Sequence, residues 1–200
     1  MARSTRESIL TAAAELMRHK GYGAVGMKDI AAASGAPIGS LYHHFRGGKV
    51  QIAREALINA GHAYALLIPT IVDAHTDLGD AVDAVFTQAA EDMAGTGFAN
   101  MCPVAIVAAE VADTVEELRS ATADVFEGWI EAGSEYFAAR GLDASQAREL
   151  TLALIGALEG AFVLARTLRS TEPLLAVGRA LAPIYRGVVM MSPVATPVSG

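Results

Sequence analysis

The sequence predicts an all-α protein with two domains. Apolar side chains, in a composition that is 52% hydrophobic, recur at helical spacing over most of the 200 residues. No segment alternates apolar and polar residues with the period of a strand, and glycines and prolines separate the helical segments from one another. A chain of this size can bury a sizeable core in one or two domains.

The first expected helix runs over residues 6–20. Ser4 or Thr5 can cap its start, and Gly21 is a suitable stop. The basic pair at residues 19–20 complements the negative end of the helix dipole. The apolar positions that keep the helical period are Ile9, Leu10, Ala13, Leu16 and Met17.

Residues 27–49 predict two short helices joined by a tight turn. Gly35 supplies the conformational freedom that such a turn needs, and Pro37 can open the second helix. In that second helix Ile38, Leu41 and Phe45 follow a spacing that gives one apolar face. The remaining side chains are small or form hydrogen bonds, which suits the major groove of DNA. The segment therefore predicts a helix-turn-helix unit.

Six further helices are expected in the rest of the chain. The glycine pair at residues 47–48 breaks the helical pattern, and Pro69 is expected to terminate the long helix that follows. The expected ranges are 49–67, 78–94, 103–112, 114–139, 145–168 and 173–188. Residues 191–200 contain two prolines among small residues and are expected to form a disordered tail.

The charge of the chain is unevenly distributed. The formal net charge is −7, yet residues 1–54 hold eight Lys or Arg against three Asp or Glu and so carry +5, whereas the remainder carries −12. Such a split suits phosphate binding by the amino-terminal part and an acidic body kept away from DNA. A solvated charged surface is the alternative interpretation of the charge alone.

The amino-terminal segment resembles the DNA-binding domain of the TetR family. The matching elements are Ile30-Ala31, Ser34-Gly35, Gly39-Ser40-Leu41-Tyr42-His43-His44-Phe45 and Lys49. The resemblance implies a domain over residues 1–48 that binds operator DNA. Together with helix geometry, it assigns DNA contacts to Lys28, Pro37, Ile38, Gly39, Ser40, Tyr42, His43, His44 and Lys49.

Two of these positions depart from the family pattern. Ile38 stands where many relatives carry a polar or basic residue, so it either contacts thymine methyls or packs. Residues 25–27 lack the threonines that relatives place before this helix, and Lys28 is expected to take over their phosphate contact. Alternatives also stay open for Tyr42, which could cover the domain core, and for His44, which could be structural.

Residues 49–190 are expected to bind a ligand and to form a dimer. One helix-turn-helix unit reads only a half-site, so a second copy is required. Residues 151–168 and 173–188 each carry an apolar stripe with small residues, and the two helices would form a four-helix bundle with their symmetry mates. The stripes could instead fill the monomer core. The residues of the two stripes are Leu154, Ile155, Leu158, Phe162, Ala165, Leu168, Leu174, Val177, Leu181, Ile184 and Val188.

An apolar effector cavity is expected between these parts. The stretch 95–104 resembles the regulatory domain of the LmrA/YxaF-like branch of the TetR family, which implies a response to hydrophobic compounds such as antibiotics and flavonoids. The expected lining residues are Leu67, Phe86, Phe98, Met101, Cys102, Val104, Phe126, Trp129 and Phe162. Polar candidates for orienting the effector are His62, Tyr64, His75, Gln88, Asn100, Glu110 and Glu159.

Other function classes find little support in the sequence. No ligand spacing for a metal accompanies His62 or His75, no cofactor is expected, and Cys102 lacks the motifs that would make it a catalytic nucleophile. A single cysteine, no signal peptide and no apolar run of about 18 residues indicate a cytoplasmic protein that does not enter a membrane.

The sequence is thus interpreted as a homodimeric, ligand-responsive transcriptional repressor. A redox-sensing regulator that uses Cys102 is the alternative, followed by an enzyme with a vestigial DNA-binding domain.

Overall fold

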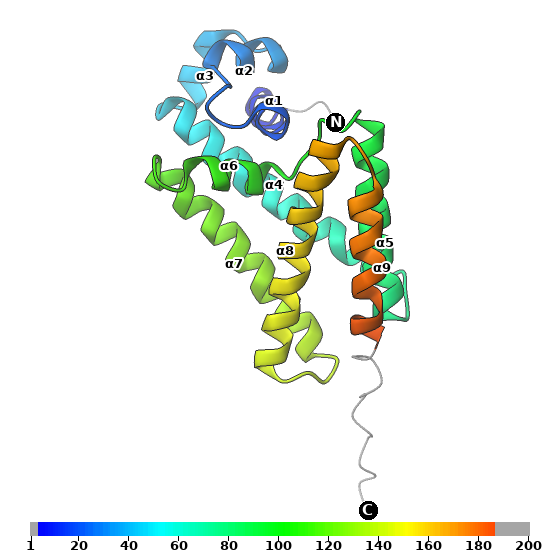
Figure 1. The fold of residues 1–200 in the computed structure, drawn as a ribbon. Helices are drawn as coiled ribbons and strands as arrows, with labels where there is room; N and C mark the ends of the chain where they lie inside the picture. Colours follow the sequence, from blue (N-terminus) through cyan, green and yellow to red (C-terminus); the bar gives the residue numbers. More distant parts are fainter. Residues whose placement is uncertain (1–3, 187–200) are drawn as a thin grey trace, which may run out of the picture. The chain divides into compact units, whose positions relative to one another are not determined.

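The computed structural model describes residues 4–186, and within them the chain forms nine α-helices and no strand (Figure 1). The all-α prediction is therefore confirmed. The predicted tail at residues 191–200 and the predicted helix end at residue 188 lie outside the described residues. The helices are α1 (Thr5–Lys20), α2 (Met27–Ser34), α3 (Ile38–His44), α4 (Gly48–Val72), α5 (Leu78–Gly95), α6 (Pro103–Val111), α7 (Glu116–Ala138), α8 (Ala144–Leu168) and α9 (Glu172–Arg186).

The chain divides into two compact units. The first comprises Met1–Leu67 and Gly95–Gly128, and the second comprises Ile68–Ala94 and Trp129–Gly200. In the first unit, α1 packs against α2, α3 and α6 (Figure 1). In the second unit, α8 packs against α9.

Local capping defines the first three helices. Ser4 and Glu7 form a capping box, in which the Glu7 N–H donates to the Ser4 hydroxyl (3.2 Å) and the Ser4 N–H donates to the Glu7 carboxylate (2.8 Å). Gly35 ends α2 in the left-handed region with φ of 68°, as the turn requires. Pro37 is the N-cap of α3, so this helix begins one residue later than the sequence predicted.

The expectation that Pro69 ends the fourth helix was wrong, because α4 continues to Val72. A proline lacks the N–H that would bond to the preceding turn, but the residues after it keep their own donors. The Asp73 N–H accordingly donates to the Pro69 carbonyl at 2.8 Å. A second difference is the start of α7 at Glu116 instead of residue 114, because the Thr114 N–H closes a turn onto the Val111 carbonyl (2.9 Å).

The second unit is held together by close helix contacts and one buried hydroxyl. Tyr185 of α9 is 1% exposed, and its hydroxyl donates to the Leu150 carbonyl of α8 at 2.6 Å. Burial raises the pKa of Tyr185 to about 12, so the hydroxyl stays protonated. Gly79 of α5 lies so close to α9 that a Cβ atom there would clash with the Ala182 carbonyl oxygen.

This close approach predicts opposite effects for two glycine substitutions. Gly79→Ala should lower the free energy of unfolding by about 1–3 kcal/mol, because α5 and α9 must separate to admit the methyl group. Gly128→Ala on α7 is the matched control, since nothing lies within 4 Å of an added Cβ in the described structure. It should raise the free energy of unfolding by up to about 1 kcal/mol through helix propensity. Urea denaturation measures both, and equal effects would contradict the packing argument.

Candidate nucleic-acid interface

The short helix α3 buries one side and exposes the other. Leu41, and Phe45 directly after the helix, are 0% exposed and lie in the core of the first unit, as predicted. The residues on the other sides are accessible: Pro37, Ile38, Gly39, Tyr42, His43 and His44 are exposed, and Ser40 is half-buried. This surface is made of small, aromatic and hydrogen-bonding groups, which are the groups that read base edges and phosphates.

Gly39 lies where an outside molecule can approach the backbone. Within the described structure nothing lies within 4 Å of a Cβ atom built at this position. Packing inside the chain therefore does not require glycine there. A glycine does allow an external backbone to come close, as a helix that enters a DNA groove demands.

The side chains of Ile38 and Tyr42 lie on the surface. Ile38 is 42% exposed and Tyr42 is 55% exposed. The sequence left open that Ile38 packs and that Tyr42 covers the domain core. Both alternatives require buried side chains, so the exposure of these two residues argues against them. His43 and His44 are also exposed, with their rings in an edge-to-face arrangement at 5.2 Å. The buried Leu41 is thus followed by three consecutive exposed side chains, and Ile38 is exposed one turn before them.

Two lysines flank α3 in the chain. Lys28 is exposed in the first turn of α2. Lys49 is half-buried at the start of α4, with its Nζ 3.9 Å from the centroid of the Tyr22 ring. Burial lowers the pKa of Lys49, while the carboxylates of Glu110 and Asp29 partly offset that effect.

The structure gives Glu110 a contact that sequence reasoning missed. Its carboxylate accepts hydrogen bonds from the backbone N–H groups of Tyr22 and Gly23, each at 2.6 Å. From the sequence, Glu110 was expected only as a polar group that could orient an effector. The glycines on both sides of Tyr22 were the available signal, because they leave the loop without side chains next to its N–H groups.

The residues predicted to line an effector cavity are distributed over both units. In the first unit Met101, Cys102 and Val104 are buried, Phe98 and Phe126 are half-buried, and Leu67 is 45% exposed. In the second unit Phe86 is buried, and Trp129 and Phe162 are half-buried. Phe98 has a φ of 62°, a conformation that side-chain-bearing residues rarely adopt.

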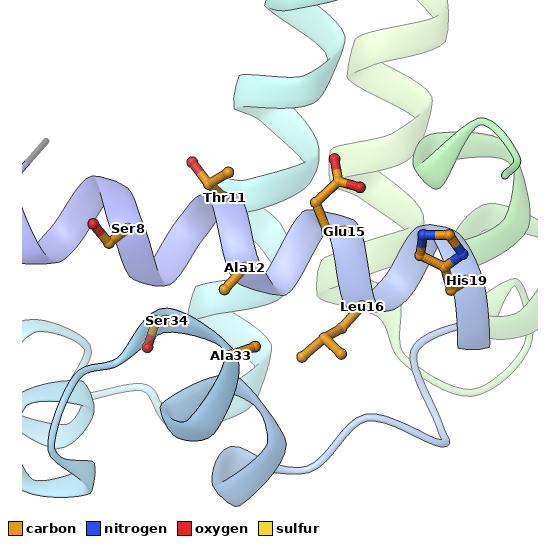
Figure 2. A pocket seen from close by; sticks show the side chains of 8 residues that line it. All are labelled: Ser8, Thr11, Ala12, Glu15, Leu16, His19, Ala33 and Ser34. Atoms are coloured by element: carbon orange, nitrogen blue, oxygen red, sulfur yellow. The ribbon is translucent and has the colours of Figure 1, made fainter. Parts of the chain in front are cut away.

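Two surface hollows are lined by other residues. Figure 2 shows the first, a hollow of about 420 Å³ where Ala12 and Leu16 of α1 face Ala33 and Ser34 of α2. The second, of about 560 Å³, includes the predicted polar candidates His75 and Gln88 beside acidic residues of α5. Neither hollow contains a residue predicted to contact DNA or to line the effector cavity.

Within residues 4–186, no cluster of three or more His, Cys, Asp or Glu side chains could hold a metal ion. By length and composition alone, α4 and α8 could each cross a membrane. The sequence predicted no membrane span because it has no unbroken apolar run of about 18 residues, whereas the apolar stretches of α4 and α8 include polar residues. Apolar helices of this length also occur in proteins without membrane spans, where they face a core or a partner.

Comparisons with known proteins agree with this arrangement. Residues 9–56 match the model of bacterial regulatory proteins of the tetR family, and residues 79–180 match that of the C-terminal domain of LmrA/YxaF-like transcriptional regulators. The transcriptional regulator LmrA of Bacillus subtilis is 31% identical over 182 residues, covering 91% of this chain and 97% of LmrA. An uncharacterized regulator of Mycobacterium tuberculosis, MT0206, is 35% identical over 181 residues, covering 88% of this chain and 91% of that protein.

A solved structure gives the same result for the fold. The regulatory protein TetR from Rhodobacter sphaeroides matches with a TM-score of 0.78 at 26% identity, covering 90% of this chain and 97% of that one. The matching families and relatives are transcriptional regulators, not enzymes, as predicted. The chain therefore belongs to the TetR family of transcriptional regulators, with a C-terminal domain of the LmrA/YxaF-like type.

Proposed function

We propose that this regulator is a dimeric repressor that binds a near-palindromic operator through α3 and is released by a small hydrophobic molecule. The observation that carries the proposal is the exposed, small and hydrogen-bonding surface of α3, with Lys28 and Lys49 on the neighbouring helices. Two copies of α3, about one DNA turn apart, would enter successive major grooves. The ammonium groups of the two lysines would bind the phosphates beside each half-site.

The exposed apolar side of α8 supports dimerisation. Leu152, Leu164 and Leu168 are 45%, 52% and 63% exposed and follow one i+4 ridge of the helix. Gly156 and Gly160 lie on the same ridge, and nothing described lies within 4 Å of a Cβ atom built on either. On α9, Ile184 is 55% exposed. A ridge of leucines around two glycines is suited to close packing against a second copy of itself.

The monomer core takes up part of the stripes that the sequence assigned to the dimer. Ala165 and Leu174 are 0% exposed, and Leu158 and Phe162 are half-buried. The i+4 ridge is therefore the better candidate for the seam. We assign the dimer contacts to the exposed residues within 151–168 and 173–188, and the ligand-binding and dimerisation domain to residues 49–190.

Features of the α5–α6 connection support an effector site. The Oδ1 atom of Asn100 is buried and has no hydrogen-bond partner in the described structure. A buried acceptor without a partner costs free energy, which a donor on a bound molecule would recover. Asn100 lies between the unusual backbone of Phe98 and the buried Met101. The Cys102 thiol is also buried, which favours an apolar effector over an oxidant.

Release requires that the effector bind better to a form of the dimer with the wrong half-site spacing. The continuous helix α4, which carries Lys49 near its start, is the proposed lever between effector and DNA. A coupling free energy of about 1–3 kcal/mol would be ordinary for such a switch.

The proposed DNA contacts are tested by Tyr42→Ala and Lys49→Ala. Each should weaken binding to the operator by about 1–3 kcal/mol without unfolding the protein. Lys49→Ala should also reduce the slope of log K against log salt by about one unit. Mobility shifts on DNA flanking the gene measure both effects. Arg119→Ala, which removes an exposed charge from α7, is the control and should change little. Unchanged affinity in both test variants would contradict the placement of α3.

The proposed seam is tested by the double variant Leu164→Glu and Leu168→Glu. Because both side chains are exposed in the monomer, the changes should leave the fold intact but place like charges across the symmetry axis. Sedimentation should show monomers with little operator affinity. The control, Ala132→Glu with Ala138→Glu on exposed positions of α7, adds the same charge and should remain dimeric. A DNA-competent dimer in the test variant would place the seam elsewhere.

The proposed effector site is tested by Phe98→Ala, Trp129→Ala and Cys102→Ser. The first two should impair release from the operator by hydrophobic antibiotics and flavonoids while leaving binding without effector nearly intact. The serine variant should matter much less. If Cys102→Ser alone abolishes release, and wild-type release requires peroxide, the redox alternative holds instead.

A further inference from the structure

The loop between α1 and α2 is built around the carboxylate of Glu110, which comes from α6 in the same unit. Both carboxylate oxygens are used: Oε2 accepts from the Tyr22 N–H and Oε1 from the Gly23 N–H, each at 2.6 Å. Hydrogen bonds from N–H groups to a carboxylate are charge-assisted and therefore stronger than neutral ones. The two carboxylate oxygens thus join Glu110 to Tyr22 and Gly23, which lie 88 and 87 positions earlier in the chain.

The glycines of the loop make room for this carboxylate. A Cβ atom at Gly21 would lie 2.5 Å from Oε2, and one at Gly23 would lie 2.5 Å from Oε1. Gly21 has a φ of 76°, which also favours glycine for the backbone, but Gly23 does not have a positive φ. At Gly23, a Cβ atom would therefore displace the Glu110 carboxylate from its present position.

Glu110 holds the backbone of Tyr22, and the ammonium group of Lys49 lies over the Tyr22 ring. The Nζ atom lies 3.9 Å from the ring centroid. Burial lowers the pKa of Lys49, and the negative charge of Glu110 counteracts this shift. Glu110 therefore acts on Lys49 in two ways, by fixing the aromatic surface beneath it and by stabilising its charge.

We propose that Glu110 is a positioning residue for the DNA-binding surface, which holds Tyr22 and thereby the Lys49 ammonium where it can meet a phosphate. This inference rests on the proposed role of Lys49 as a phosphate contact. It assigns a favourable role in binding a polyanion to an acidic side chain of α6, outside the helix-turn-helix segment. Charge alone predicts the opposite sign, because removal of a carboxylate reduces repulsion from DNA.

The test compares Glu110→Gln and Gly23→Ala with the control Asp113→Asn. The control removes one negative charge from an exposed position three residues further along the chain. In Glu110→Gln an NH2 group replaces one of the two acceptor oxygens, so one backbone N–H group loses its acceptor. Gly23→Ala displaces the carboxylate but keeps its charge. The probe is a DNA duplex of random sequence, so that no operator needs to be known. Circular dichroism melting verifies that each variant is folded.

Glu110→Gln and Gly23→Ala should each weaken duplex binding by about three- to tenfold and flatten its salt dependence toward that of Lys49→Ala. Asp113→Asn should leave binding unchanged or strengthen it. In a Lys49→Ala background, Glu110→Gln should cause no further loss, because both changes remove the same contact. Hydrogen exchange at the Tyr22 and Gly23 amides should become faster in Glu110→Gln and not in Asp113→Asn.

The possible failures are distinguishable. If Lys49→Ala itself leaves duplex binding unchanged, the proposed phosphate contact fails, and the inference for Glu110 fails with it. If Lys49→Ala weakens binding but Glu110→Gln behaves as Asp113→Asn does, only the role of Glu110 is overturned. Unchanged amide exchange in Glu110→Gln would likewise overturn it.

Discussion

The proposed DNA-binding surface depends on the burial of Leu41 and Phe45. The helix between Ile38 and His44 has seven residues, fewer than the roughly 12–15 that an isolated helix needs to persist in water. Only its packing into the first unit keeps it formed. The two buried side chains therefore fix both the existence of α3 and the direction in which Tyr42 and its neighbours project.

Contacts between segments far apart in the chain reinforce this anchor. Arg6 of α1 forms an ion pair with Glu55 of α4, and its guanidinium lies 5.2 Å from the centroid of the Phe45 ring. Arg54 of α4 pairs with Glu117 of α7 at 3.4 Å. Together with the Glu110 contact, these interactions link α1, α4, α6 and α7 with the loop between α1 and α2. The exposed side of α3 is thus presented by a framework that extends well beyond the helix-turn-helix segment.

Features that depend on interactions within one helical turn could be predicted from the sequence, and features that join distant segments could not. The starts and ends of α1 and α2 were predictable because Ser4, Glu7 and Gly35 act within one turn of themselves. The exposed side of α3 was equally predictable, because the candidates from Pro37 to His44 lie in or directly before one short helix. Their contact with DNA stays a prediction. The Tyr22–Lys49–Glu110 arrangement was not, since it brings together three elements that no local pattern connects. For the same reason, sequence spacing could not separate the residues of α8 that face α9 from those that remain exposed.

The course of α4 through Pro69 has a mechanical consequence. Pro69 has no N–H to donate to the carbonyl of Ala65, so the helix lacks one backbone hydrogen bond in this turn. The division between the two compact units falls within the same turn, between Leu67 and Ile68. A helix with a missing bond bends more readily there than elsewhere along its length. The covalent link that α4 provides between the units therefore has one fewer backbone hydrogen bond close to the boundary between them.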